Sequence, residues 1–96
     1  MKAKEFLEKA AALVSNDRNA SHGDLVECHK AIAAVWNGIL EASGKLDTPL
    51  DASDVARLMI GLKIARSYQG SFNADDMIDA AGYSACAGQI MAERNR

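Results

Sequence analysis

The fold is decided by residues 21–43, which read SHGDLVECHKAIAAVWNGILEAS. Apolar side chains recur there at every third or fourth position, namely Leu25, Cys28, Ile32, Val35, Trp36 and Ile39. That spacing is the period of one face of an α-helix. Ser21 is expected to cap this helix, with Asp24 at the third position after it, and Ser43-Gly44 is expected to end it. We therefore predict a long helix over Gly23–Ser43.

Three more segments have helical spacing, and local signals mark their ends. The predicted helices are Lys2–Ser15, Ala52–Gln69 and Ala74–Arg94. Asp51 can cap the second of these, with Asp54 as an acid in its first turn, and Asn73 can cap the third. Residues 44–50, which include Pro49, form the main turn. The sequence thus predicts an all-α bundle of about four helices in a single domain, residues 1–96.

The apolar surface of these helices exceeds what one short chain can cover. The helix over Ala52–Gln69 carries an apolar stripe and two further isoleucines outside it: Val55, Leu58, Met59, Leu62 and Ala65, then Ile60 and Ile64. The last helix is lined with small residues, where Gly82 and Gly88 leave room for another backbone or a ligand. We therefore predict a homo-oligomer, in which a ligand site would form between subunits.

Composition excludes several classes of function. The net charge of -2 gives no basic surface for DNA or RNA, and no apolar segment is long enough for a membrane span. The amino terminus carries Glu5 and Glu8 within its first helix and does not resemble an export signal. Cys28 and Cys86 lack the spacing of a zinc site or a disulfide framework. The expected location is the cytoplasm.

The strongest polar signal is a set of charges on the last two helices. Lys63 and Arg66 lie one turn apart within an apolar stretch, and Asp76 and Asp79 have the same spacing, with Tyr83 following on the same side. The two cations can anchor a phosphate or pair with acids. The two acids can hold Mg²⁺ or pair with those cations. Both alternatives stay open at this stage.

A second polar group surrounds the start of the long helix. It comprises Arg18, His22, Gly23, Asp24 and His29. Free backbone N–H groups at a helix start attract anions, although a polar capped turn has the same composition. The two histidines lack a placed third ligand, so no metal site is predicted. Nor does the chain contain a catalytic motif.

Trp36-Asn37 is the remaining polar signal. The indole of Trp36 lies on the apolar stripe and fits a core position, but its flat face can also stack a nucleobase.

In combination, these residues resemble a family of short, uncharacterised phage and prophage proteins. The matching elements are Arg18, His22-Gly23-Asp24, Ile32-Ala33, Trp36-Asn37, Asp54-Val55-Ala56, Lys63-Ile64-Ala65-Arg66 and Asp76-x-x-Asp79-x-Ala81-Gly82-Tyr83. They cover most of the chain. The resemblance implies phage relatives, and an infected bacterial cell as the location, without implying a reaction.

A more distant resemblance is to the MazG-type all-α nucleoside triphosphate pyrophosphatases. Those enzymes bind Mg²⁺ through an ExxE pair and a later ExxD pair. Asp24-x-x-Glu27 and Asp76-x-x-Asp79 can imitate the two pairs, but each pair lacks a glutamate and the separation is longer than usual. Under this alternative alone, Mg²⁺ would be a cofactor.

The leading hypothesis is a small oligomeric protein that captures a nucleotide-type ligand without converting it. Phages carry small helical proteins that sequester the nucleotide signals of bacterial immunity, and this chain is similar in size and class. The expected contacts come from Arg18, His22, Asp24, Lys63, Arg66, Asp76, Asp79 and Tyr83, with no catalytic residue and no cofactor. The alternatives are the Mg²⁺-dependent pyrophosphatase and a helical adaptor that inhibits a host protein.

Overall fold

The computed structural model describes residues 1–15 and 24–94, and this part of the chain is helical without any strand. The four helices are α1 (Ala3–Leu13), α3 (Leu25–Ala42), α4 (Ala52–Ser67) and α5 (Ala74–Arg94). The predicted all-α class and the four predicted helices are confirmed. Helix α1 stops two residues before the predicted Ser15, and α4 stops two residues before the predicted Gln69.

Local capping explains where the helices begin. The Asp51 carboxylate accepts the Asp54 backbone N–H at 2.9 Å, which confirms the predicted cap of α4. Asp54, expected only as a first-turn acid, also accepts the Asp51 N–H at 2.9 Å, and the two contacts form a capping box. Asn73 caps α5 by accepting the Asp75 N–H at 3.0 Å. Gly44 follows α3 with a φ of 72°, a conformation that glycine adopts without steric cost.

The predicted start of α3 needs a correction. Asp24 is itself the N-cap, and its carboxylate accepts the Val26 N–H at 2.9 Å. The helix therefore begins at Leu25, two residues after the predicted Gly23. Asp24 has the short acceptor side chain that a cap requires, so it can take the role that we expected of Ser21. Ser21 lies outside the described residues.

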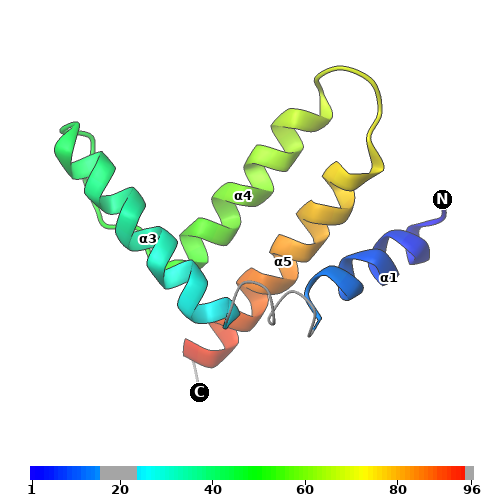
Figure 1. Cartoon of the computed structure of the whole chain (residues 1–96), viewed down its shortest axis with the longest axis horizontal. Coiled ribbons are helices and arrows are strands. Elements are labelled where there is room, and N and C mark those ends of the chain that lie inside the picture. The colour runs from blue at the N-terminus through cyan, green and yellow to red at the C-terminus, as the bar shows by residue number, and fades with distance from the viewer. Residues whose placement is uncertain (16–23, 95–96) are drawn as a thin grey trace.

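The helices form an open arrangement in which α5 is central. Figure 1 shows α4 running beside α5, α1 on the other side of α5, and α3 diverging from α4 like the second arm of a V. The core joins α4 and α5 through Ala56, Cys86 and Ala87, with Val14 and Leu25 packed against them. Small side chains at these positions let the helices approach closely.

The helix faces that the structure buries differ in part from the faces that the sequence predicted to be buried. On α4, Val55 and Ala56 are fully buried, but Leu58 and Leu62 of the predicted stripe are exposed. On α5, Gly82 faces Val14, to which an added Cβ would come within 3.6 Å, whereas a Cβ at Gly88 would meet nothing within 4 Å. Gly82 thus lies at a helix contact as predicted. Within the described chain, Gly88 does not.

Candidate functional site

The cations and acids predicted to form a site meet across the contact between α4 and α5. Lys63 Nζ lies 3.0 Å from an Asp79 carboxylate oxygen, with side-chain exposures of 14% and 29%. Arg66 Nε lies 4.0 Å from Asp76, the limit of an ion pair, and its side chain is 60% exposed. Of the two alternatives in the sequence, pairing is the one that forms. Contact of these residues with a ligand stays a prediction.

Tyr83 lies one turn beyond Asp79 and packs against His29 of α3. The two rings meet edge to face, with centroids 6.4 Å apart. His29 is only 5% exposed, and its Nδ1 lies 2.9 Å from the Leu25 carbonyl oxygen. Because a carbonyl can only accept, Nδ1 carries the proton, and His29 acts here as a packed and hydrogen-bonded side chain.

The space beside this group is too small for a nucleotide. A recess of about 60 Å³ is lined by Asp79, Tyr83 and their neighbours on α1 and α5. Sites for small organic ligands usually measure about 300 to 1,000 Å³. Arg18 and His22, which were expected to assist from the start of α3, lie outside the described residues.

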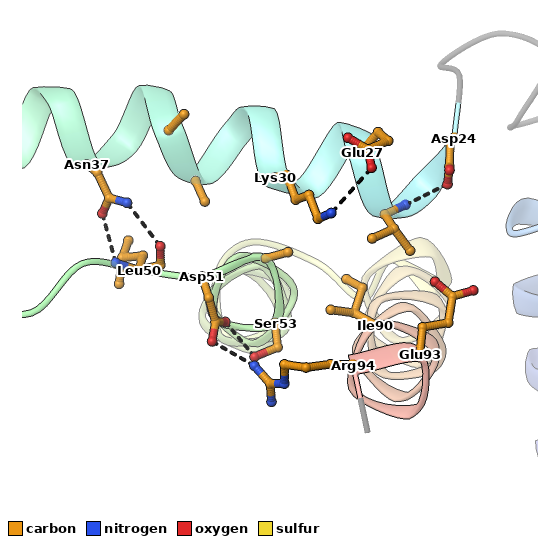
Figure 2. Close-up of a pocket in the computed structure, with 14 residues that line it drawn as sticks. Asp24, Glu27, Lys30, Asn37, Leu50, Asp51, Ser53, Ile90, Glu93 and Arg94 are labelled. Carbon is orange, nitrogen blue, oxygen red and sulfur yellow. Dashed lines mark hydrogen bonds and ion pairs between the residues drawn. The ribbon is translucent and has the colours of Figure 1, made fainter. Parts of the chain in front are cut away.

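A much larger cavity lies between α3, the start of α4 and the end of α5. Its volume is about 630 Å³. Figure 2 shows its wall, with α3 along one side and the ends of α4 and α5 facing it. The lining residues are Asp24, Val26, Glu27, Lys30, Ala33, Ala34, Asn37, Leu50, Asp51, Ala52, Ser53, Ile90, Glu93 and Arg94. Of the predicted ligand contacts that fall within residues 1–15 and 24–94, Asp24 alone appears in this wall.

Asn37 fixes one end of the cavity. Its side-chain amide donates to the Leu50 carbonyl at 3.0 Å, and its side-chain oxygen accepts the Leu50 N–H at 2.8 Å. The turn after α3 is thereby attached to α3 itself, as Figure 2 shows. Both functional ends of the Asn37 amide are used in this way, so its role here is structural. Its neighbour Trp36 is half-buried and does not occupy a full core position.

Asp51, Ser53 and Arg94 form a linked polar group on the side of the cavity that faces α3 (Figure 2). The Ser53 hydroxyl donates to Asp51 at 2.6 Å, and Arg94 Nη1 donates to the second Asp51 oxygen at 2.8 Å. The Ser53 hydrogen bond and then the Asp54 backbone N–H lower the pKa of Asp51 from 3.8 to about 2. Desolvation by burial opposes them, and Arg94 adds a lesser lowering of the pKa. Asp51 is therefore ionised at neutral pH.

Among the residues that the structure describes, the cavity lining carries more acidic than basic side chains. These are two cations, Lys30 and Arg94, and four carboxylates. Lys30 pairs with Glu27 at 3.3 Å and Arg94 with Asp51, and all four of these side chains are at least half-exposed. Exposed pairs are weak, so each cation can exchange its partner for a ligand at low cost. Sequence reasoning missed Lys30, Glu93 and Arg94 because no motif marks them.

The two acid pairs of the MazG-type alternative lie in different places. Asp24 and Glu27 line the large cavity beside Ile90, whereas Asp76 and Asp79 pair with α4. The eleven residues from Asp79 to Ile90 correspond to about 16 Å of helix. Within the described ranges, no three His, Cys, Asp or Glu side chains are grouped to hold a metal ion.

Comparison with known proteins places the chain in a family. Residues 5–91 match a domain of unknown function, DUF6378, and the chain belongs to that family. It is 35% identical over 91 residues to the Gene 55 protein of Mycobacterium phage D29, which covers 95% of this chain and 56% of the relative. The Gene 55 protein of Mycobacterium phage L5 is 33% identical over 79 residues, covering 82% and 47%.

These findings confirm the predicted relationship to uncharacterised phage proteins. The chain spans about half the length of the curated relatives that it matches. The comparisons do not show the MazG-type resemblance, and no solved structure matches. None of the helices described is both long and apolar enough to cross a bilayer.

Proposed function

We propose that this chain binds a nucleotide-type small molecule in the cavity between α3, α4 and α5 and holds it without chemical conversion. The observation that carries the proposal is the volume of that cavity, about 630 Å³, which suits a ligand of this size. The recess beside Tyr83, at about 60 Å³, does not. The proposed site therefore lies about three turns of α5 away from the charged residues that the sequence emphasised.

The lining supplies each kind of contact that a nucleotide needs. Lys30 and Arg94 are the cations, and an Arg fork can grip phosphate oxygens at two points. Carboxylates such as Glu27 and Glu93 accept hydrogen bonds from ribose hydroxyls and base amino groups. Ala33 and Ile90 give apolar surface for the face of a base.

The charge balance narrows the ligand class. In the described part of the lining, four carboxylates against two cations leave a surplus of two negative charges. A triphosphate would add several more negative charges and would be repelled. A nucleotide with one phosphodiester charge adds least, so we expect cyclic or linked mononucleotides to bind better than nucleoside triphosphates.

Membership in a family with phage relatives supports a role in infection. In this proposal, the protein acts as a homo-oligomer in the infected bacterial cell and removes a nucleotide signal of host immunity from solution. Capture needs affinity and copy number but no turnover, which agrees with a site assembled from exposed ion pairs and hydrogen-bonding groups.

One observation favours a second candidate function. Asp24 and Glu27, the first acid pair of the MazG-type pattern, both line the cavity, where carboxylates could hold Mg²⁺ next to a bound phosphate. Under this alternative the ligand would be a nucleoside triphosphate and would be cleaved. Mg²⁺ dependence and pyrophosphate release distinguish this enzyme from a capturing protein.

The test is incubation of the protein with mono-, di-, tri- and cyclic nucleotides, with and without Mg²⁺, followed by heat release and chromatography. Recovery of an unchanged, low-charge nucleotide is the expected result. Pyrophosphate and a monophosphate would establish the enzymatic alternative. Failure to retain any nucleotide would contradict both and leave a helical adaptor for a host protein.

Matched variants locate the site. Arg94→Gln removes a cation of the cavity, and Arg66→Gln removes a similarly exposed arginine outside it. Losing a charge-assisted contact costs about 1.5 to 3 kcal/mol, or roughly tenfold or more in affinity. We expect that loss for Arg94→Gln and unchanged binding for Arg66→Gln in calorimetry. The reverse result would return the site to the Lys63 and Arg66 group.

A further inference from the structure

The apolar stripe of α3 does not coincide with the face that this chain buries. The stripe comprises Leu25, Cys28, Ile32, Val35, Trp36 and Ile39, and none of these side chains is buried. The buried residues of α3 are His29 and Ala33. Leu25 packs against the core cluster at the amino-terminal end of the stripe. Toward the carboxyl end the stripe becomes more open, and Val35 and Ile39 are each 61% exposed.

Helix geometry separates the stripe from the cavity. Successive residues of an α-helix are rotated by about 100°, so the stripe and the cavity-lining positions of α3 point about 170° apart. The cavity-lining positions are Val26, Glu27, Lys30, Ala33, Ala34 and Asn37. Helix α3 therefore has two opposite faces, one that lines the cavity and one that carries the apolar stripe.

The chain as a whole exposes too much surface for a monomer of its size. Its accessible surface is 6535 Å², whereas a folded monomer of 10.2 kDa exposes about 5,300 Å². Its radius of gyration is 14.6 Å, against about 12.5 Å for a compact chain of this length. The excess of accessible surface, roughly 1,200 Å², is larger than the ~800 Å² of surface that each partner buries in a standard interface.

We propose that a second copy of this chain covers the apolar stripe of α3, centred on Val35 and Ile39, in a two-fold dimer. A single apolar helix face can pack on its own copy, as an isologous interface requires. In Figure 1 the carboxyl-terminal half of α3, with no other helix beside it, is open to such a partner. The two cavities stay accessible because they lie on the opposite face of α3.

The test is the mass in solution, measured by light scattering at micromolar concentration. The wild type is expected at twice 10.2 kDa. Val35→Lys with Ile39→Lys places like charges across the two-fold axis, and lysine keeps the helix favourable, so the dimer dissociation constant should rise roughly a hundredfold or more. The matched control is Leu7→Lys, an equally exposed leucine of α1, which should remain dimeric.

Circular dichroism establishes that each variant is folded, and Val35→Ala with Ile39→Ala gives a milder second test with an expected weakening of about tenfold. A wild type found only at 10.2 kDa would overturn the proposal. So would a folded double-lysine variant that stays dimeric, or dissociation by Leu7→Lys alone. Since the lining of the cavity is unchanged in these variants, failure of the dimer is distinguishable from failure of ligand binding.

Discussion

The Lys63–Asp79 pair between α4 and α5 permits a quantitative prediction. Its 3.0 Å contact is mostly covered, with Lys63 only 14% exposed. Replacing Asp79 by Asn leaves that ammonium without its counter-charge in a poorly hydrated position. Breaking a fully buried ion pair lowers the free energy of unfolding by about 3 to 5 kcal/mol, and breaking an exposed pair lowers it by less than about 1 kcal/mol. For Asp79→Asn we therefore expect the free energy of unfolding to fall by about 1 to 3 kcal/mol.

The assay is a double-mutant cycle with Lys63→Gln, Asp79→Asn and both together, measured by urea denaturation. The coupling free energy should be about 1 to 2 kcal/mol, because the double variant removes both charges and strands neither. In thermal unfolding, the single Asp79→Asn variant should melt roughly 4 to 20 °C lower. Lys4→Gln is the control, since the Lys4–Glu8 pair at 3.9 Å is exposed on both sides, with side-chain exposures of 87% and 62%, and its loss should change stability little.

Two results would refute this reasoning. A coupling free energy near zero would mean that the contact contributes nothing to the α4–α5 packing. If Lys63→Gln is as stable as the wild type but no longer binds nucleotide, then Lys63 is a ligand contact, as the sequence pattern also allowed. The cycle therefore decides between the two roles of this charged group.

Three further predictions follow from single residues. Asp51 has a folded-state pKa of about 2 against 3.8 unfolded, so its stabilisation is complete above pH 4 and is lost as the pH falls toward 2. The Asp51→Asn variant keeps a side chain that can cap the helix. The difference in free energy of unfolding between wild type and this variant should shrink over that pH range, as measured by denaturation at a series of pH values. Gly88→Ala should raise stability by about 1 kcal/mol, since the added Cβ meets no atom of this chain within 4 Å, and calorimetry checks it. Asn37→Ala removes both hydrogen bonds to Leu50 and should cost about 1 to 3 kcal/mol while increasing amide exchange at Leu50.

The features that could be predicted from the sequence depend on interactions between residues close together in the chain. Helix number and approximate extent follow from spacing, and caps follow from side chains within three positions of the backbone that they bind. The Asp51 cap and the Asn73 cap were therefore predictable. Lys63 with Asp79 was foreseeable as a possible pair, because two charged helices of a small bundle are adjacent.

Tertiary structure decided which face each helix buries and where space remains. The stripe of α3 is the most apolar face of that helix, but the chain buries the face carrying His29 and Ala33, because that is the side on which α4 and α5 lie. The cavity joins residues from positions 24–37, 50–53 and 90–94, and its Arg94–Asp51 contact spans 43 positions. Spacing along one helix carries no information about such distances. They depend on the angles at which helices cross, and those angles are set by side-chain volumes at contacts such as Ala56 with Cys86 and Ala87.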